Sequence, residues 1–259
     1  MLVKCRRLTG RCDAVLAINV AYGGIIGMLA RKPYVVFAYA YEFMKFAHTP
    51  ILGGLLRRVY RRAKAVVAIS EFTRRNLEEF GVDGGRIRVV LPGAEPDVSV
   101  SEAEIDAVRH TYVLDDNRVI LSVGRLIPRK NHIGLVRALP KVLERIPDTV
   151  LLIAGQGPCM WEICQEAHRL GVREQLVLPG KVAESDLAAL YAACDVFALP
   201  AGADERGQVE GFGLVFSEAH AHGKPVAGGK SGGVPEAVID GETGLLVEPD
   251  DVDGLSEAL

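Results

Sequence analysis

Short apolar runs separated by helical stretches recur along the whole chain, and this alternation constrains the fold more than any other feature. Each run is rich in Val, Ile and Leu, ends at a Gly- or Ser-marked turn, and precedes a longer segment with helical spacing. Such apolar runs are typical of parallel strands buried on both faces. The sequence therefore predicts an α/β protein built from doubly wound parallel sheets. We expect strands at residues 15–18, 35–39, 65–69, 88–91, 119–123, 150–154, 176–178, 196–199, 225–227 and 245–247.

A break in this rhythm predicts a boundary between two domains. Residues 92–97 are rich in turn formers, residues 101–112 form an acidic helical stretch, and a polar turn follows. We therefore expect a partial N-terminal domain with its linker in residues 1–116 and a second domain in residues 117–259. Only four of the expected strands fall in the first part, and the last helical pattern is cut short. Both the N-terminal domain and the C-terminal end are thus expected to be incomplete.

Composition and charge argue against several classes of protein. The chain has 30 Lys and Arg residues against 33 Asp and Glu residues, a net charge of −3 that is too balanced for a dedicated nucleic-acid-binding protein. The five cysteines include no Cys-x-x-Cys pair, so we expect reduced thiols in the core rather than a zinc site. The uncharged run at residues 14–30 contains Asn19 and several glycines, which makes it a poor membrane span. We expect a buried strand, a glycine turn and a short helix there instead. Because no apolar leader follows Met1, we expect a cytoplasmic protein.

Three loops that follow predicted strands carry candidate ligand contacts. The first contains Gly124, Arg125, Arg129 and Lys130 and leads into a helix. In open α/β sheets, ligands bind beyond the carboxyl ends of the strands, where helix N-termini attract anions. The basic side chains therefore favour an anionic ligand, although three cations on a loop are equally compatible with a solvated surface.

The second loop has two glycines before a predicted helix. One carboxylate begins the loop, and another follows in the helix. The loop residues are Glu210, Gly211, Phe212, Gly213 and Leu214, and Glu218 follows in the helix. Glycines let backbone N–H groups approach a ligand such as a phosphate closely. Since Glu218 lies about two helical turns beyond Glu210, the two carboxylates can reach different parts of one elongated ligand. The alternative interpretation is a glycine-marked helix start followed by an exposed glutamate.

The third loop, residues 228–236, imitates a phosphate-binding P-loop without matching it. Gly229-Lys230-Ser231 has the correct ending, but Lys224 occupies the position of the first required glycine. We therefore exclude ATP hydrolysis of the P-loop type. The chain also lacks a Gly-x-Gly-x-x-Gly fingerprint, a His-Glu-x-x-His motif and a Gly-x-Ser-x-Gly elbow.

Taken together, the three loops resemble the donor-binding half of the retaining nucleotide-sugar glycosyltransferases of family 4. The resemblance rests on the segment from Gly124-Arg125 to Lys130-Asn131, on the spacing of Glu210 and Glu218, and on Gly232-Gly233-Val234-Pro235-Glu236. It implies the GT-B fold, in which two Rossmann-like domains face a cleft. The first half resembles the later part of an acceptor domain, because Ala68-Ile69-Ser70-Glu71-Phe72-Thr73 matches a strand-to-helix segment of the family.

The resemblance also implies roles for individual residues. Arg125 and Lys130 would hold the diphosphate and neutralise the charge that grows on it as the glycosidic bond breaks, and Glu210 would bind hydroxyls of the sugar. These three are the expected catalytic residues. The expected donor-binding residues are Gly124, Gly211, Phe212, Gly213, Leu214 and Glu218, the last of these at the ribose. The anomeric configuration would be retained without a covalent enzyme intermediate, and neither a divalent metal nor another cofactor is expected.

Similarity of the second and third loops to mannosyltransferases favours transfer of mannose from GDP-mannose to a lipid-linked or saccharide acceptor. UDP-glucose is the competing donor. A truncated or degenerate nucleotide-sugar-binding protein is a second hypothesis, because the family's opening strand is not found and Tyr39 stands where relatives often have histidine. A GT-B-fold epimerase is a third, but it would need a carboxylate pair at the sugar that Glu210 alone does not provide.

A basic amphipathic segment in the first half has two interpretations, one of which is contact with a membrane. It contains Arg57, Arg58, Arg61, Arg62 and Lys64. Segments of this kind dock on anionic bilayer surfaces. A peripheral location on the inner face of the cell membrane is therefore one interpretation of this segment. The pattern slightly favours the other interpretation, a solvated helix face that packs on the sheet by its apolar side.

Overall fold

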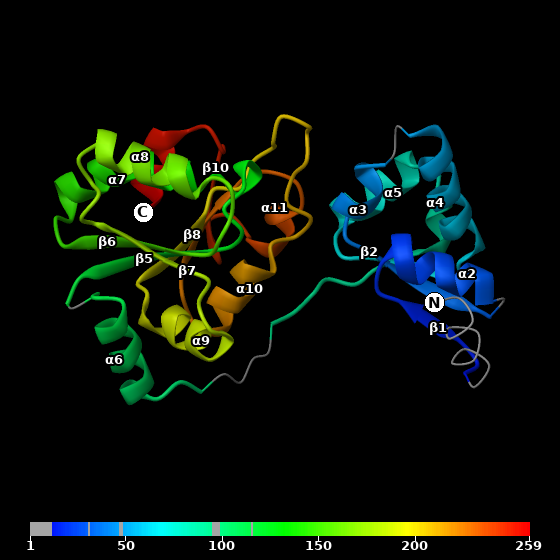
Figure 1. Cartoon of the computed structure of the whole chain (residues 1–259), viewed down its shortest axis with the longest axis horizontal. Coiled ribbons are helices and arrows are strands. Elements are labelled where there is room, and N and C mark those ends of the chain that lie inside the picture. The colour runs from blue at the N-terminus through cyan, green and yellow to red at the C-terminus, as the bar shows by residue number, and fades with distance from the viewer. Residues whose placement is uncertain (1–11, 31, 47–48, 95–98, 115) are drawn as a thin grey trace. The chain divides into compact units, whose positions relative to one another are not determined.

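The computed structural model describes residues 12–30, 32–46, 49–94, 99–114 and 116–259, which form two compact units divided between Pro92 and Gly93 (Figure 1). This division lies earlier in the chain than the predicted boundary at residue 116. The difference is α6 (Glu102–Thr111), which the sequence analysis grouped with the linker. Val108 of α6 belongs to the same buried cluster as Ala189 of α9 (Glu184–Ala193), so α6 is part of the second unit.

The first unit contains a parallel sheet of four strands in the order β1-β2-β3-β4. The strands are β1 (Val15–Ala17), β2 (Tyr34–Ala38), β3 (Ala65–Ala68) and β4 (Ile87–Val89). The helical segments are η1 (Val20–Gly24), α2 (Ile25–Ala30), α3 (Tyr41–Met44), α4 (Pro50–Arg62), α5 (Glu71–Glu79) and η2 (Gly84–Arg86). All four strands expected in this part of the chain are confirmed.

The core of the first unit joins one side of β2 to the helices. Positions along β2 alternate between buried and half-buried, and Val36 packs in one cluster with Leu56 of α4 and Leu77 of α5. The expected glycine turn after β1 is instead the π-helical segment η1, which Asn19 caps. Gly24 is required there because a Cβ atom at this position would lie 2.7 Å from Cγ1 of Val59.

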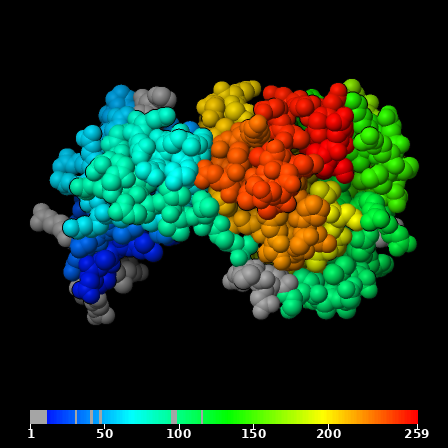
Figure 2. Space-filling view, turned by 180° about the vertical axis from the view of Figure 1, so that it is seen from behind, coloured from blue at the N-terminus to red at the C-terminus, as the bar shows by residue number. Residues whose placement is uncertain are grey.

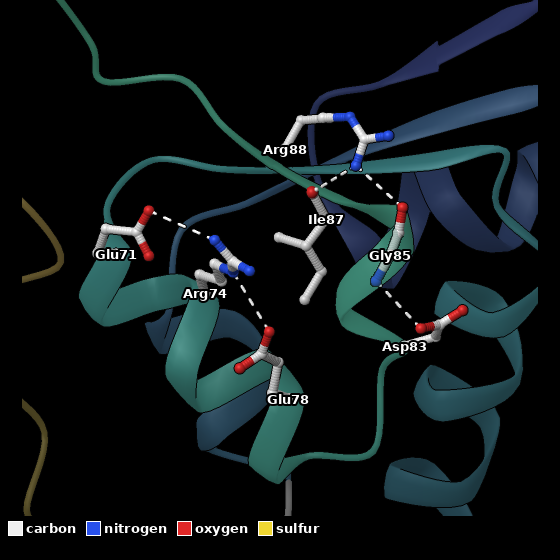
Figure 3. Close-up of polar contacts among 7 residues, drawn as sticks. All are labelled: Glu71, Arg74, Glu78, Asp83, Gly85, Ile87 and Arg88. Atoms are coloured by element: carbon white, nitrogen blue, oxygen red, sulfur yellow. Dashed lines mark hydrogen bonds and ion pairs between the residues drawn. The ribbon is translucent and has the colours of Figure 1, made fainter.

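A local polar contact fixes the start of α5, and ion pairs run along its exposed face, as Figure 3 shows for the latter. Ser70 caps the helix by accepting a hydrogen bond from the backbone N–H of Thr73, which confirms the predicted helix start. Arg74 lies 3.6 Å from the carboxylate of Glu71 and 3.2 Å from that of Glu78. Since these side chains are exposed, each pair contributes only about 0.3–0.5 kcal/mol.

The second unit contains six parallel strands in the order β10-β9-β8-β5-β6-β7. The strands are β5 (Arg118–Val123), β6 (Thr149–Ala154), β7 (Leu176–Gly180), β8 (Val196–Leu199), β9 (Val226–Gly229) and β10 (Gly244–Val247). The helices besides α6 and α9 are η3 (Pro128–Lys130), α7 (His132–Arg145), α8 (Met160–Arg169), α10 (Leu214–Ala221), α11 (Val234–Ala237) and α12 (Val252–Ala258). Because β5 lies in the middle and later strands are added first on one side and then on the other, this is the strand order of a Rossmann fold.

Helices cover both faces of this second sheet. One cluster packs residues of α7, α8 and α12 against the sheet, and the other packs α6, α9 and α10 against its opposite face, as Figure 1 shows. Every residue of β6 is buried, as expected for a strand in the middle of a doubly wound sheet. The C-terminal segments from β9 to α12, orange to red, form one continuous surface of this unit in Figure 2. The predicted α/β architecture is confirmed.

The cysteines that the structure describes are free thiols, as expected. Cys194 is buried, and burial raises the pKa of its thiol to about 12. Cys12, Cys159 and Cys164 are only partly buried, so the expectation of core positions holds for Cys194 alone among these four. Cys5 lies outside the described residues.

Candidate functional site

The candidate site lies where the strand order of the second unit reverses. β5 and β8 are neighbours in the sheet, but the chain leaves β5 toward β6 on one side and leaves β8 toward β9 on the other. The carboxyl ends of both strands lead into predicted ligand loops. In open α/β sheets a crevice at such a point is the usual position of a ligand.

Lys130 and Glu210 meet at this point. Nζ of Lys130 lies 2.6 Å from Oε2 of Glu210, and the two side chains are only 12% and 16% exposed. Among the described residues Oε2 has no hydrogen bond of good geometry, so the contact is an ion pair. Attraction in such a partly dehydrated place is stronger than at the surface. The structure thus brings together two of the three residues expected to be catalytic.

The loop that carries Lys130 is held in place by backbone and amide contacts. Asn131 ends η3 and begins α7 with a left-handed backbone at φ 51°, a conformation that asparagine tolerates better than most residues. Its side-chain amide donates to the carbonyl of Pro249 at 2.7 Å. The N–H of Gly202, in the loop after β8, donates to the carbonyl of Arg129 at 2.8 Å. The two site loops are therefore joined next to Lys130.

The backbone of the third predicted loop, residues 228–236, contacts the backbone of the second loop at Glu210 and Gly211. The N–H of Gly233 donates to the carbonyl of Glu210 at 2.9 Å. A Cβ atom at Gly233 would lie 2.1 Å from the carbonyl oxygen of Gly211, and one at Gly232 would lie 2.2 Å from that of Glu210. These glycines are needed for contact between two backbones rather than for contact with a ligand.

The segment between Glu210 and α10 combines buried side chains with a helix start that has no side-chain cap. Gly213 precedes α10 with φ 92° and has no side chain to bond the first N–H groups of the helix. Phe212 is 4% exposed and Leu214 is 41% exposed. Gly211 is buried. Phe212 therefore belongs to the packing of the loop.

Glu218 lies on α10 and accepts a hydrogen bond that the sequence did not predict. The Oη atom of Tyr191, on α9, lies 2.7 Å from Oε2 of Glu218. Burial, and then the negative charge of Glu218, raises the pKa of Tyr191, so its hydroxyl stays protonated and donates. The ring of His222 stacks on that of Tyr191 with centroids 5.5 Å apart. Tyr191 sits inside an ordinary helical pattern, and no motif marks it.

Arg125 points to a different part of the site from Lys130. It is exposed and lines a pocket of about 320 Å³ together with Gln156 and Lys181, beyond the ends of β6 and β7. Gly155 lets the two loops approach, because a Cβ atom there would lie 1.8 Å from the carbonyl oxygen of Gly124. Gln156 and Lys181 were not predicted, since neither belongs to a motif.

His132 is a buried neighbour of Lys130 at the start of α7. It is only 2% exposed, and its Nε2 has no hydrogen-bond partner among the described residues. Burial, and then the positive charge of Lys130, lowers the pKa of His132 to about 3. The imidazole is therefore neutral near pH 7, and its place directly after Lys130-Asn131 is the signal that could have pointed to it.

The remaining predicted residues lie in the first unit. Tyr39 follows β2 and is 44% exposed. On α4, Leu56, Val59 and Tyr60 are buried, while Arg58, Arg61 and Arg62 are exposed. Arg57 is held inward, since its Nε donates to the carbonyl of Phe80 at 3.1 Å and its guanidinium lies 4.8 Å from the Phe80 ring centroid.

The described part of the chain contains neither a side-chain cluster suited to a metal ion nor a helix suited to span a membrane. No group of three or more His, Cys, Asp or Glu side chains in residues 12–30, 32–46, 49–94, 99–114 and 116–259 is arranged to hold a metal ion. Within the same residues, no helix combines the length and the apolar character needed to cross a bilayer.

Both halves of the chain match glycosyltransferase family models. Residues 105–259 match the model of glycosyl transferases group 1, and residues 4–98 match that of glycosyltransferase family 4. A GDP-mannose-dependent alpha-(1-6)-phosphatidylinositol monomannoside mannosyltransferase of Mycolicibacterium smegmatis is 35% identical over 241 residues, 91% of this chain and 63% of that protein. A GDP-mannose-dependent monoacylated alpha-(1-6)-phosphatidylinositol monomannoside mannosyltransferase of Corynebacterium glutamicum is 34% identical over 79% of this chain and 54% of that protein. The chain thus spans between about half and two thirds of these relatives.

Solved structures show the same fold. HepE of Anabaena, in complex with UDP-glucose, matches with a TM-score of 0.84 and 25% identity, over 99% of this chain and 70% of that one. A sucrose-phosphate synthase of Thermosynechococcus elongatus matches with a TM-score of 0.80 and 22% identity, over 99% of this chain and 66% of that one. The match of the group 1 model covers more than half of the residues, and the fold is the GT-B fold of these neighbours. The chain belongs to the glycosyl transferases group 1 family.

Proposed function

We propose that this chain binds a nucleotide-diphosphate sugar and transfers its hexose, with retention of configuration, to a lipid-linked or saccharide acceptor. The observation that carries the proposal is the ion pair of Lys130 and Glu210 at the point where the strand order reverses. In a nucleotide sugar the terminal phosphate is bonded directly to the anomeric oxygen. A cation and a carboxylate side by side therefore suit the phosphate and the sugar hydroxyls next to it.

The two side chains can bind a ligand without separating. An ammonium group has three N–H donors, so Lys130 can bond a phosphate oxygen while it keeps Glu210 as a partner. A carboxylate has roughly four acceptor positions, which leaves Glu210 capacity for sugar hydroxyls. The fixed ammonium would then stabilise the negative charge that develops on the departing diphosphate, which costs little reorganisation in a site of low exposure.

Arg125 has a different task in this proposal from the one that the sequence suggested. It lines the pocket with Gln156 and Lys181, beyond β6 and β7. We assign it to the nucleotide end of the diphosphate rather than to the bond that breaks. The pocket, about 320 Å³, is also lined by the apolar residues Val123, Ala154, Val182 and Leu187, and it suits a flat ring with polar edges.

GDP-mannose is the donor that we propose, because the M. smegmatis and C. glutamicum relatives are named as GDP-mannose-dependent mannosyltransferases. Those names also contain a phosphatidylinositol mannoside, which supports a lipid-linked acceptor. The HepE structure holds UDP-glucose, so UDP-glucose is the donor to test against it. We expect transfer to need neither a divalent metal nor another cofactor.

Separate partners for the two glutamates argue against the epimerase hypothesis. Glu210 pairs with Lys130, whereas Glu218 accepts from Tyr191 on another helix. An epimerase would need two acid or base groups directed at one sugar carbon. Two carboxylates with different partners suit a ligand that spans them.

Calorimetric titration with GDP, UDP, GDP-mannose and UDP-glucose tests donor binding. We expect GDP and GDP-mannose to bind most tightly and Lys130→Met to weaken both by at least about tenfold, because the lost interaction is charge-assisted. Lys141→Met is the matched control, since Lys141 lies on α7 and pairs with Asp253 at the surface. Binding that is equal in wild type and Lys130→Met would refute the assigned role.

Transfer and its stereochemistry need a separate assay. Incubation with GDP-mannose and a phosphatidylinositol mannoside, followed by NMR of the anomeric proton of the product, should show an α-linkage. A β-linked product would refute retention. Donor binding without any transfer would favour the hypothesis of a nucleotide-sugar-binding protein without activity.

The basic face of α4 leads us to propose peripheral contact with the inner face of the cell membrane. Arg58, Arg61 and Arg62 are exposed on the side of α4 opposite to its buried residues, and Ile51 at its start is 89% exposed. Positive charge next to an exposed apolar residue suits an anionic bilayer. Co-sedimentation with vesicles that contain anionic lipid should exceed that with phosphatidylcholine vesicles, and replacement of the three arginines by glutamine should remove the difference. Equal sedimentation in both would refute the contact.

A further inference from the structure

A buried tyrosine lies behind the carboxylate that we assign to the ribose. Tyr191 is 2% exposed, and its ring packs against those of Phe197, at 5.7 Å, and His222, at 5.5 Å with an interplanar angle of 21°. Aromatic neighbours on two sides leave the ring little freedom. The position of its hydroxyl is therefore set by the core of the second unit.

That hydroxyl donates to the carboxylate of Glu218. Oη lies 2.7 Å from Oε2, the length of a good O–H···O bond to a charged group. The backbone of the same residue is held as well, because Nδ1 of His222 lies 2.9 Å from its carbonyl oxygen and donates to it. Tyr191 thus holds the carboxylate of Glu218, and His222 holds its backbone carbonyl.

We propose that Tyr191 is a positioning residue for nucleotide recognition, whose hydroxyl orients the Glu218 carboxylate toward the two hydroxyls of the ribose. The inference rests on the proposed function, in which Glu218 binds the ribose. A glutamate side chain rotates about three bonds, and it loses conformational entropy when a ligand holds it in one orientation. A fixed donor on Oε2 removes much of that freedom before the nucleotide arrives, and the carboxylate keeps acceptor positions for the ligand.

The chemistry of the pair favours this role over simple packing. A buried hydroxyl is costly unless it is hydrogen-bonded, and phenylalanine would fill the same space among Phe197 and His222 without that cost. Because burial raises the pKa of Tyr191, the phenol donates to Glu218 at any ordinary pH. The ligand that this arrangement selects is a ribonucleoside diphosphate rather than its dideoxy analogue.

The experiment compares GDP with 2′,3′-dideoxy-GDP by calorimetric titration, in wild type and in Tyr191→Phe. We expect wild type to prefer GDP by at least about tenfold, since the analogue has no hydroxyls to donate to the acceptor positions of Glu218 that Tyr191 leaves open. We expect Tyr191→Phe to bind GDP about fivefold to tenfold more weakly and the dideoxy analogue within about twofold of wild type. The preference for ribose should therefore shrink.

Tyr34→Phe is the matched control for loss of a buried tyrosine hydroxyl. The Oη of Tyr34 donates to the carbonyl of Val59 at 2.6 Å in the first unit. Both variants should lower the midpoint of thermal unfolding, but Tyr34→Phe should keep the wild-type affinities for both nucleotides. A change in the GDP preference of Tyr191→Phe is thus separated from a loss of stability.

Each other outcome overturns a defined part of the argument. If Tyr191→Phe binds GDP as wild type does, or loses both ligands equally, Tyr191 does not position Glu218. If wild type binds both nucleotides equally well, Glu218 does not hold the ribose and the inference fails, while nucleotide-sugar binding stands. If wild type binds neither, the proposed function fails as well.

Discussion

Acid should destabilise this protein through the histidine next to Lys130. The pKa of His132 is lowered to about 3 in the folded state, first by burial and then by Lys130, whereas an unfolded histidine titrates near 6.5. Between these values the unfolded chain binds one more proton than the folded one, so the free energy of unfolding falls as the pH falls. The slope is about 1.4 kcal/mol per pH unit once the pH is well below 6.5. Between pH 7 and pH 5 this residue should thus remove about 2 kcal/mol.

Urea unfolding at several pH values between 5 and 7 measures this effect in wild type and in His132→Leu. Leucine binds no proton in either state, so the variant should lose about 2 kcal/mol less than wild type over this range. His168→Leu is the control, because the side chain of His168 is exposed, and it should keep the wild-type pH dependence. If His132→Leu shows the same dependence as wild type, the imidazole is not held neutral by burial and the reasoning is wrong.

Three further predictions follow from contacts in the structure. Gly233→Ala should lower the free energy of unfolding, measured with urea, by about 2–4 kcal/mol, because its Cβ atom would lie 2.1 Å from the carbonyl oxygen of Gly211. Gly54→Ala in α4 should instead raise it by about 0.5–1 kcal/mol, because the new Cβ atom would have no atom within 4 Å. A double-mutant cycle with Lys130→Met and Glu210→Gln should give a coupling energy of about 1–2 kcal/mol, and a value near zero would contradict their ion pair. Hydrogen bonds from Arg169 and Arg137 lower the pKa of Glu166 to about 2. The contribution of Glu166 to the stability of the folded state is therefore complete above pH 5 and is lost as the pH falls toward 2. Glu166→Gln should therefore unfold with a weaker pH dependence between pH 5 and pH 2, and an unchanged acid-unfolding profile would contradict this.

The strands could be predicted from the sequence because each is a local pattern. All ten predicted strands are found, with ends displaced by at most two residues. Helix starts at Ser70 and Ser101 were also predictable, because a capping side chain bonds a backbone N–H only a few residues away. The segment after β1 was misjudged, because Gly23 and Gly24 suggested a turn. In the structure both lie in a π-helical segment, with Gly23 close to Ala17 and Gly24 close to Val59.

The domain boundary shows where local pattern stops being sufficient. The sequence marks residues 92–117 as a break and gives no sign of which unit α6 joins. α6 joins the second unit because Val108 and Tyr112 meet α9, about eighty residues away in the chain. Which unit α6 belongs to thus depends on the contact of its apolar face with α9 in the folded chain.

The sequence by itself determined the α/β class, the order of the strands along the chain, and the loops that hold Lys130, Glu210 and Glu218. These depend on residue periodicity and on glycine positions, which are properties of neighbouring residues. Only the tertiary structure decided that β5 and β8 are adjacent, that Lys130 therefore meets Glu210, and that Arg125 faces the pocket beyond β6 and β7. It also decided that Tyr191 and His132, which no motif marks, lie against the site. Lys130 and Glu210 lie 80 positions apart and Tyr191 and Glu218 lie 27 apart, because buried apolar surface and strand pairing, rather than sequence proximity, set which of these side chains become neighbours.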